Sequence, residues 1–470
     1  MTVKRIVCTI LLGVFVIGSL VSCGSNQSAN TSVTSATSAA ADTTADAGKE
    51  NTTSEKDETS AMSTADTPTE MIEIRFPWWG NTTRHEKYDK LMDLFEAEYP
   101  NIKVVREPST FDDYWIKVAT QTAGGNPPDV LMFTQGQLSE YVARDAVLPL
   151  DDYINSGFID VSEFSETAIA NGKYQDKIYV ITKGLSAPAL FVNVSLLERS
   201  GAELPPEEMT WEDYKAYLLK IAPLLGENAQ GVKTYPSSDL AFDNAFLESY
   251  LRLSGKSLFN ETGNGLGFEK DDLFAWFEYW ADLRELELIP SAEIQAEWYK
   301  LQWEQGILAN HVVAIEARAS NHLKVLQSHM EDEVSLWRIP GGEDGQTKYG
   351  EILMTASLGI SSFSKNPDAV ATLINFWCND DEFNALYEHE HGIVGNQRIL
   401  DSMKMDPSDQ KTVDHLRQVL NTIVPQPQRP PGQTPIFAQI DKSWQAYYFG
   451  EISLEQAVDQ IFAEAEQVLS

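Results

Sequence analysis

The sequence predicts an α/β fold with two lobes. Between residues 72 and 133, segments with the period-two pattern of strands alternate with segments of helical spacing, in the order β-α-β-α-β. This order is typical of a layered domain with a largely parallel sheet. About 400 residues follow the low-complexity amino-terminal region, and one hydrophobic core rarely grows that large, so a second lobe is expected.

The first 22 residues have the layout of a secretory leader. Lys4 and Arg5 precede an apolar run over 6–21, which is too short for a comfortable membrane span. The run ends in Leu-Val-Ser-Cys at Cys23, which resembles the lipobox of bacterial lipoproteins, where the cysteine is lipidated and begins the mature chain. We therefore expect a signal peptide and a lipid such as palmitate on Cys23. The alternative is an ordinary leader cleaved nearby, which leaves a free thiol.

Residues 23–70 are expected to form a tether. Beyond the cysteine the segment consists mostly of Ser, Thr, Ala, Asp, Asn and Glu, and residues 24–70 include no aromatic residue. Such a composition cannot bury enough apolar surface to offset the entropy lost on ordering. A disordered stalk of this kind lets a folded body move above a membrane surface.

The composition is strongly acidic, with 70 Asp and Glu against 35 Lys and Arg and a formal net charge of −35. This balance excludes nucleic acid as a partner, since phosphate contacts need clustered Lys and Arg. It also disfavours an anionic ligand held by the field of the whole protein.

Cysteine usage in the sequence leaves no pair for an intrachain disulfide. Cys8 lies in the leader and Cys23 is the expected lipidation site, so Cys378 is the remaining cysteine. Its apolar neighbours predict that it is buried as a small hydrophobic residue.

The folded part is expected to begin with a strand that carries two tryptophans at its end. Alternate apolar residues from Ile72 to Phe76 predict a half-buried strand. Because Pro77 cannot donate to a sheet ladder and Gly80 frees the backbone, Trp78 and Trp79 are expected at the strand's carboxyl end, where its loop begins. Open α/β sheets place their ligands at that edge. The alternative is that both indoles pack in the core.

Further helices and strands are predicted from the spacing of apolar residues and from the residues that start and stop helices. We expect a helix over 87–99, a strand over 102–106, a helix over 111–122 and a buried strand over 129–133. Asp129, after two prolines, is expected to hold the turn before its strand. Thr210 and Asp213 have the spacing of a capping box. The aromatic residues over 273–280 recur at helical spacing and indicate a core helix rather than a ligand platform.

Eight segments carry a resemblance to a known family, through their order and spacing rather than any single motif. They are Phe95-Glu-Ala-Glu-Tyr-Pro-Asn-Ile-Lys-Val, Gly125-Asn-Pro-Pro-Asp-Val, Leu148-Pro-Leu-Asp-Asp-Tyr-Ile, Phe191-Val-Asn-Val-Ser-Leu-Leu, Met209-Thr-Trp-Glu-Asp-Tyr, Gly306-Ile-Leu-Ala-Asn-His-Val-Val-Ala-Ile, Ile339-Pro-Gly-Gly and residues 358–376. From residue 72 to the carboxyl terminus, the chain resembles the family 1 extracellular solute-binding proteins of ABC importers, relatives of the maltose- and glycerol-phosphate-binding proteins.

The resemblance implies a two-lobed periplasmic-binding-protein-like fold of class II. Each lobe is then a central sheet flanked by helices, and three hinge crossings join the lobes. Mapped onto this chain, lobe one is expected over 71–184 plus 317–357, and lobe two over 185–315 plus 359–470. Small residues over 183–188 and 356–359 suit the hinge crossings.

The resemblance also implies the function. We expect a lipid-anchored, monomeric receptor outside the cytoplasmic membrane, which closes around a carbohydrate and delivers it to an ABC permease. It is expected to need no cofactor and to perform no catalysis.

Candidate ligand residues combine two chemistries that sugars require. Indoles stack on the apolar faces of sugar rings, and polar side chains exchange hydrogen bonds with the hydroxyls. For each candidate the alternative is a solvated loop residue or a packed tryptophan. The set is Trp78, Trp79, Asn81, Arg84, Gln135, Trp298, Trp303, Glu316 and Arg318 from the pattern, Ser186 from the hinge, and Ser237, Asp239 and Arg429 from the resemblance.

Two motifs raise the question of a metal. His389-Glu390-His391 has two imidazoles, but alternate residues on a helix diverge and no third ligand accompanies them, so a charged loop is favoured. The stretch from Asn260 to Asp271 departs from the calcium-loop pattern at its first and twelfth positions, so a hairpin turn is favoured. We therefore expect no metal.

Two other function classes remain open. A secreted carbohydrate-active hydrolase would use paired carboxylates, such as Asp151 with Asp152, Asp271 with Asp272, or Glu316. With 70 acidic residues such pairs arise by chance. A membrane-tethered adhesin accounts for the leader and stalk but not for the α/β order.

Overall fold

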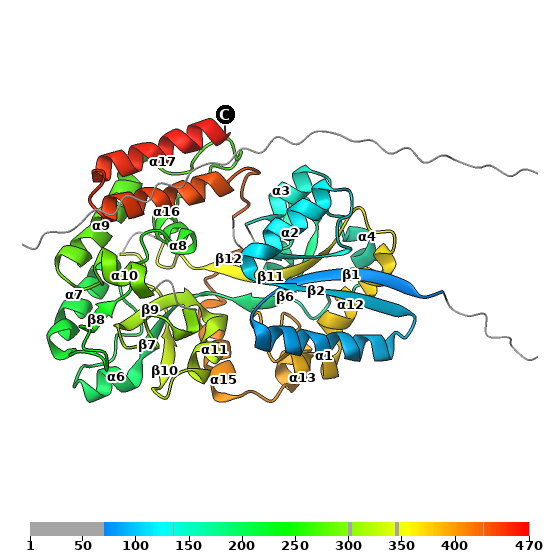
Figure 1. Cartoon of the computed structure of the whole chain (residues 1–470), viewed down its shortest axis with the longest axis horizontal. Helices are drawn as coiled ribbons and strands as arrows, with labels where there is room; N and C mark the ends of the chain where they lie inside the picture. The colour runs from blue at the N-terminus through cyan, green and yellow to red at the C-terminus, as the bar shows by residue number, and fades with distance from the viewer. Residues whose placement is uncertain (1–69, 135, 299–302, 344–346, 426, 470) are drawn as a thin grey trace, which may run out of the picture. The chain divides into compact units, whose positions relative to one another are not determined.

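The computed structural model describes residues 70–469 except 135, 299–302, 344–346 and 426 (Figure 1). These residues belong to one compact unit, Asp66–Ser470. The expected signal peptide, Cys23 and the tether fall on residues 1–69 and lie outside the described part. Within that part, no helix has both the length and the apolar composition needed to cross a bilayer.

The first lobe is built on strands β1, β2, β3, β6 and β11. β1 (Ile72–Trp79) pairs in parallel with β2 (Ile102–Ser109) over its whole length. β11 (Ile352–Ile360) pairs antiparallel with both β3 (Val130–Thr134) and β6 (Val180–Ser186). The largely parallel sheet expected from the β-α-β order is therefore interrupted by a strand that comes from much later in the chain.

Helices cover both faces of the first lobe, as Figure 1 shows for α1, α12 and α13 on one side and α2, α3 and α4 on the other. The elements of this lobe, besides its five main strands, are α1 (Thr82–Glu98), α2 (Phe111–Ala123), α3 (Leu138–Ala143), α4 (Asp151–Asn155), α5 (Glu166–Ala170), β4 (Lys173–Tyr174), β5 (Lys177–Ile178), α12 (Pro367–Asn379), α13 (Asp381–Tyr387), α14 (Gln397–Ser402) and β12 (Val424–Pro425).

The second lobe contains a four-stranded sheet of order β10-β7-β9-β8. β7 (Pro188–Asn193) is antiparallel to β9 (Val313–Ala319) and to β10 (Val334–Trp337), whereas β8 (Tyr235–Ser237) is parallel to β9. The helices around it are α6 (Val194–Arg199), α7 (Trp211–Ile221), η1 (Ala222–Leu224), α8 (Asn244–Leu253), α9 (Lys270–Glu285), α10 (Ala292–Trp298), η2 (Trp303–Gln305), η3 (Ser320–His322), α11 (Leu323–Ser328), α15 (Pro407–Val419), α16 (Thr434–Tyr448) and α17 (Leu454–Leu469).

The hydrophobic cores divide the chain differently from the expected lobe boundaries. Residues 323–337, expected in lobe one, form α11 and β10, and they pack with β7 and β9 of lobe two. Residues 367–402, expected in lobe two, form α12 to α14 and pack with β1 in lobe one. The physical reason is that β10 completes the edge of the lobe-two sheet, so the chain returns to lobe one only at β11. Small residues indicate where the backbone can bend but not which core the next segment joins.

The chain leaves lobe one at Ala187. β6 ends at Ser186 in the first sheet and β7 begins at Pro188 in the second. A fourth small cluster, which includes Leu185, Ala187 and Leu353, packs at this junction.

Several local predictions are confirmed. Thr210 and Asp213 form a complete capping box at the start of α7. Trp276, Phe277 and Trp280 of α9 are fully buried. Cys378 is buried and free, and burial raises the pKa of its thiol to about 12.

Asp129 holds the turn before β3, as predicted. Its carboxylate accepts a hydrogen bond from the backbone of Arg75 at 2.8 Å and one from the Ser364 hydroxyl at 2.6 Å. β1 ends at Trp79, so Trp78 and Trp79 lie at its carboxyl end as predicted, and Pro77 lies within the strand in register with β2. Pro77 is tolerated because it only leaves out its own donor, while its neighbours keep the pairing.

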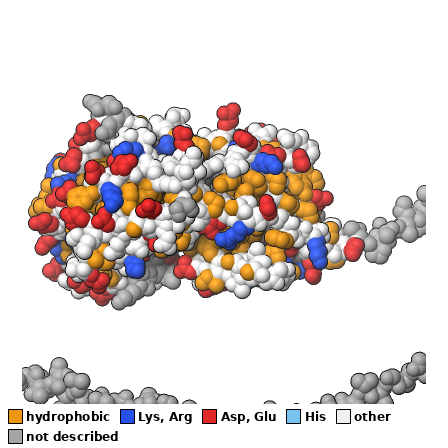
Figure 2. All heavy atoms as spheres, turned by 90° about the horizontal axis from the view of Figure 1, so that it is seen from above, with side chains coloured by type: hydrophobic (Ala, Val, Ile, Leu, Met, Phe, Trp, Pro, Cys, Tyr) orange, Lys and Arg blue, Asp and Glu red, His pale blue; other side chains and the backbone are white. Residues whose placement is uncertain are grey.

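The surface agrees with the acidic composition. On the face drawn in Figure 2, Asp and Glu side chains are spread widely, and Lys and Arg are sparser. Apolar side chains also reach this face, as they do on most folded proteins.

We predict that Thr210→Ala destabilises the protein by about 1 kcal/mol, because the substitution removes the side-chain cap of α7. Urea denaturation followed by tryptophan fluorescence measures the change. Thr83→Ala, at an exposed position of α1, is the matched control and should stay within about 0.5 kcal/mol of the parent. Equal effects of the two substitutions would contradict the capping role.

Candidate ligand-binding site

A cavity of about 530 Å³ lies where residues of both lobes meet. We call it the cleft cavity. Lobe one contributes Trp79, Arg84, Phe111, Thr134, Gly136, Ser186, His391 and, from β11, Met354, Thr355 and Ala356, and the remaining lining residues are Ala245, Ala319, Asn321, His322 and Arg429.

Aromatic rings form one wall of the cleft cavity. Trp79, at the end of β1, is 6% exposed and meets Phe111 edge to face, with ring centroids 5.5 Å apart. Tyr114 and Trp115 of α2 pack against the same indole. Phe111 is 45% exposed and opens α2 directly after its cap, Thr110. Both rings line the cavity, and Phe111 is the more exposed of the two.

A second cavity, of about 870 Å³, adjoins the first and shares Phe111, Ala245 and Arg429 with it. We call it the adjoining cavity. Further aromatic side chains line it, and so does Gln295, which is 3% exposed. Neither amide atom of Gln295 has a hydrogen-bond partner among the described residues. A buried amide of this kind is available to a ligand. The other aromatic lining residues are Phe242, Phe437, Trp444, Tyr448 and Phe449.

Arg84 of α1 is held in place by Glu390. Its Nε donates to the carboxylate at 2.8 Å, and Nη2 donates to the Glu390 carbonyl at 3.3 Å. Lys87 shares the same carboxylate at 3.1 Å. Burial by itself raises the pKa of Glu390. Arg84 and Lys87 together lower the pKa by more than burial raises it, so the net shift is downward. The carboxylate therefore stays charged and fixes Arg84 at the cleft.

Arg429 lies in both cavities, with its guanidinium 4.7 Å from the centroid of the Phe437 ring. Burial lowers the pKa of Arg429 to about 10, although Glu248 and Asp243 act in the opposite direction. Arg429 is still protonated at neutral pH. The residue thus brings a weakly solvated positive charge to the cleft.

His391 belongs to a buried chain of hydrogen bonds. Its Nδ1 lies 2.7 Å from the Tyr88 hydroxyl, which in turn accepts from Lys183 Nζ at 2.6 Å. The Nε2 atom of His391 is buried and has no hydrogen-bond partner among the described residues. Burial lowers the pKa of His391, and Arg84, Lys183 and His322 lower it further. The ring is therefore neutral.

The structure brings four of the predicted residues together at the cleft cavity: Trp79, Arg84, Ser186 and Arg429. Three of them surround the point where β1 ends and β6 passes into β7. Gln135 and the side chain of Trp303 lie outside the described residues.

The other predicted residues line neither cavity, and each has a different structural role. Trp78 is fully buried and donates to His85, and Asn81 caps α1. Ser237 bonds to Tyr214, Asp239 bonds to Trp444 and pairs with Arg284, Trp298 packs beside the lobe-two sheet, and Glu316 pairs with Arg318. Most of these residues were chosen because they lie near the end of an expected strand or helix. That criterion also selects residues that cap helices or pack in the core.

Sequence reasoning missed Phe111, His391 and the η3 residues Asn321 and His322. Phe111 follows the carboxyl end of β2, the same signal that selected Trp79, but it was assigned to the helix alone. His389, Glu390 and His391 lie in a loop that carries the charge of Glu390, as expected, but both imidazoles are buried rather than solvated. In the described part of the chain, no three His, Cys, Asp or Glu side chains are grouped to hold a metal.

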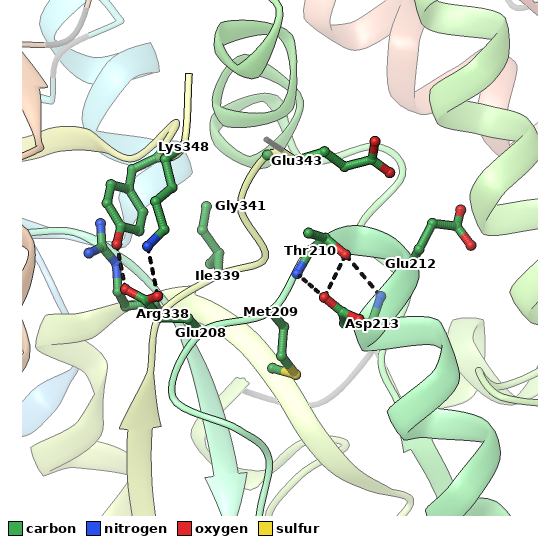
Figure 3. A pocket seen from close by; sticks show the side chains of 12 residues that line it. Glu208, Met209, Thr210, Glu212, Asp213, Arg338, Ile339, Gly341, Glu343 and Lys348 are labelled. Atoms are coloured by element: carbon green, nitrogen blue, oxygen red, sulfur yellow. Dashed lines mark hydrogen bonds and ion pairs between the residues drawn. The ribbon is translucent and has the colours of Figure 1, made fainter. Parts of the chain in front are cut away.

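A third cavity, of about 600 Å³, lies within lobe two beside the start of α7 (Figure 3). Its polar groups are mostly engaged with one another. Glu208 binds Lys348 at 2.8 Å and also the hydroxyl of Tyr349, while Thr210 and Asp213 form the capping box. This cavity offers little unsatisfied hydrogen-bonding capacity to a ligand.

Comparison with known proteins identifies a family. Residues 90–407, more than half of the chain, match the family described as bacterial extracellular solute-binding protein. A binding protein of Brucella abortus is 30% identical over 141 residues, which are 30% of this chain and 33% of that protein. The match thus spans about a third of the length of that protein and of two similar Brucella binding proteins.

Solved structures share the fold. A substrate-binding protein of Listeria monocytogenes in complex with cycloalternan superposes with a TM-score of 0.72 at 20% identity, over 85% of this chain and 99% of that one. An oligogalacturonide-binding protein of Yersinia enterocolitica in complex with saturated digalacturonic acid gives 0.72 at 18% identity, over 85% and 98%. A family 1 protein of Alicyclobacillus acidocaldarius gives 0.64 at 21%, over 85% and 99%. These likenesses establish the two-lobed fold.

We predict that Glu390→Gln destabilises the protein by about 1–3 kcal/mol at pH 7, because Arg84 and Lys87 lose their shared carboxylate. The folded-state pKa of Glu390 lies below its ordinary value of 4.5. Its contribution is therefore present above pH 4.5 and is lost as the pH falls through the lower folded-state value. Urea denaturation at pH 7, 5, 4 and 3.5 should show the gap between parent and variant closing.

The control is Glu388→Gln, in the same loop, where the side chain is 52% exposed. It should change stability by no more than about 0.5 kcal/mol. A pH-independent effect of Glu390→Gln would mean that the side chain acts through packing and not through its charge.

Proposed function

This chain is a bacterial extracellular solute-binding protein, and we propose that it is the substrate-binding component of an ABC importer that takes an oligosaccharide into the cleft. In this proposal it delivers the sugar to a membrane permease and performs no covalent chemistry. The observation that carries the proposal is the cleft cavity, lined from both lobes and bordered by the exposed ring of Phe111.

The chemistry of the lining supports a sugar. An aromatic ring at the cavity wall suits the apolar face of a pyranose. Hydroxyl and amide groups from Thr134, Ser186, Asn321 and Thr355 suit its hydroxyls. The adjoining cavity adds five further aromatic side chains and the unsatisfied amide of Gln295.

The size of the site supports an oligosaccharide over a single sugar. The cleft cavity and the adjoining cavity, of about 530 and 870 Å³, share three lining residues. Each alone is within the range of a small-molecule site. The relatives from Listeria monocytogenes and Yersinia enterocolitica were solved with oligosaccharides, and we extend that class of ligand to this chain.

The proposed mechanism is a shift between open and closed arrangements of the lobes. A sugar that contacts both lobes binds the closed form more tightly and so increases its population. The connection from β6 to β7 through Ala187 is the hinge we propose for this motion. The permease then recognises the closed form.

The leader and lipobox motif support a location outside the cytoplasmic membrane. We propose that a lipid on Cys23 anchors the protein and that residues 24–69 act as its stalk. A monomer suffices for this role, because one chain contributes both sides of the cleft.

The hydrolase alternative is less well supported. Paired carboxylates would have to face the sugar, yet the described lining of the cleft cavity includes no Asp or Glu. The adjoining cavity is lined by two carboxylates, but Asp243 caps α8 through the backbone of Ala245 at 2.8 Å, and Asp441 accepts from Gln445 at 2.8 Å.

We predict that Phe111→Ala weakens oligosaccharide binding about 10- to 100-fold, equivalent to roughly 1.5–3 kcal/mol, because it removes the exposed ring of the cleft. A thermal-shift screen of mono- and oligosaccharides first identifies the ligand, since a sugar at about 100 times its Kd stabilises by roughly 2.7 kcal/mol. Calorimetry then measures affinity, and chromatography checks that the sugar is recovered intact.

Phe158→Ala is the matched control, because this ring is 44% exposed in lobe one and lines neither cavity. Its affinity should equal that of the parent. If Phe111→Ala also keeps full affinity, the cleft wall proposed here is not the sugar platform. Smaller sugars released on incubation would instead favour the hydrolase.

We also predict that Cys23→Ser releases the protein from the membrane, because serine cannot carry the thioether-linked lipid. Fractionation of cells that express each form measures the distribution. Cys378→Ser, which leaves the lipobox intact, should remain with the membrane fraction. Membrane association of the Cys23 variant would refute the anchor.

A further inference from the structure

We propose that the saccharide bound in the cleft carries a carboxylate, as a uronic acid does, and that His391, Arg84 and Arg429 bind it. The inference rests on the proposed function, because it names the class of sugar that the same cleft takes. The acidic composition disfavours anions only through the field of the whole protein. The groups that line the cavity act at contact distance, where local charge is decisive.

The first argument is the direction of the hydrogen bonds behind His391. Lys183 Nζ lies 5.3, 5.2 and 5.7 Å from the ring centroids of Tyr88, Trp377 and Tyr387, which stabilise an ammonium group. Burial lowers the pKa of Lys183 well below its ordinary value, and Arg84 lowers it further. In either protonation state the amine can donate, and its Nζ donates to the Tyr88 oxygen at 2.6 Å. With its oxygen accepting from Lys183, the Tyr88 hydroxyl can donate its proton to His391 Nδ1, 2.7 Å away, and we assign the bond in this direction.

The second argument follows for the other nitrogen of His391. Because the neutral ring accepts at Nδ1, its proton is on Nε2. His391 is 7% exposed and lines the cleft cavity, and Nε2 has no partner among the described residues. A buried donor without an acceptor is costly. A ligand oxygen placed in the cavity removes that cost.

The third argument is the charge of the lining. The described residues of the cleft cavity include Arg84 and Arg429 together with two histidines, and no Asp or Glu. Hydroxyl groups of a neutral sugar donate as well as accept, and a carboxylate in the site is a common acceptor for them. A ligand carboxylate accepts only, so it matches a lining rich in donors.

The size of the positive charge favours a single negative charge on the ligand. Arg84 already shares Glu390 with Lys87, and Glu248 and Asp243 lie near Arg429. The uncompensated charge is therefore small. A carboxylate with one charge suits it better than a phosphate monoester, which carries nearly two at neutral pH.

The test compares acidic oligosaccharides with matched neutral ones. Dimers and trimers of galacturonic acid and of glucuronic acid are titrated into the full chain by calorimetry, beside the same oligomers after reduction of their carboxyl groups. We expect at least one acidic oligomer to bind 10- to 100-fold more tightly than its reduced counterpart, the range of a hydrogen bond to a charged group. A sugar phosphate and a sulfated disaccharide form the third set.

Variants then identify the residues responsible. Tyr88→Phe keeps the buried ring but removes the hydroxyl that orients His391, and Arg429→Met removes a charge from the cleft. Each substitution should reduce the ratio of the affinity for the acidic oligomer to that for the reduced oligomer by about tenfold. A general loss of stability would weaken both affinities and leave this ratio unchanged. Lys348→Met, in the cavity of Figure 3, should leave the ratio unchanged.

The outcomes separate this inference from the proposed function. Tighter binding of a neutral oligomer than of its acidic counterpart overturns the carboxylate and leaves the carbohydrate function standing. Preference for the phosphorylated or sulfated sugar also overturns it. If no saccharide of any set binds, the proposed function fails and the inference fails with it. A selective acidic ligand whose ratio is unaffected in both variants overturns the assignment to these residues.

Discussion

The cleft depends on the burial of apolar side chains in two separate cores. One core packs around β1, β3 and α12, and the other around α7, α9 and α16. Between the two cores, several residues that line the cleft cavity have small side chains or none. They are Gly136, Ser186, Ala245, Ala319 and Ala356. Larger side chains at these positions would fill the space. The cavity thus results from small residues placed where neither core needs volume.

The strand that joins the lobes also fixes the polar side of the cleft. The backbones of Leu185 and Ile393 exchange two hydrogen bonds, of 2.7 and 2.8 Å, so the loop that carries His391 is bound to β6. A side chain at Gly184 would come within 2.5 Å of the His391 carbonyl oxygen. Lys183 precedes that glycine and reaches Tyr88 behind the loop. Any rotation at Ala187 therefore acts next to the His391 ring, which lines the cleft cavity.

The sequence predicted the fold class better than it predicted the site. Period-two alternation and capping residues act over a few neighbours, which is why β1 and the Thr210 cap were found. The insertion of β11 between β3 and β6 depends on pairing across more than 160 residues, and nothing local specifies it. The cores divide the chain elsewhere than the expected lobe boundaries for the same reason.

Only some of the predicted residues line the cleft cavity, because the signal used to choose them was a residue type at a strand end. Trp79 and Arg84 satisfy that criterion and line the cavity, but Trp78 satisfies it equally and is buried in the core. Alternate side chains of a strand face opposite sides of the sheet, so adjacent tryptophans must separate. Which of the two faces the cleft is decided by the register with β2. His391 was missed because its role requires Tyr88 and Lys183, which are distant in sequence.

The contrast between the whole protein and its cleft has a physical basis. A net charge of −35 acts through water and salt, where exposed charges are screened within about 10 Å. Within the cleft, Arg84 and Arg429 are partly withdrawn from water and their interactions are stronger. An acidic surface can therefore keep the protein soluble while a basic pocket selects the ligand. The composition of the chain accounts for its acidic surface. The charge of the cleft depends instead on how a few buried side chains are arranged.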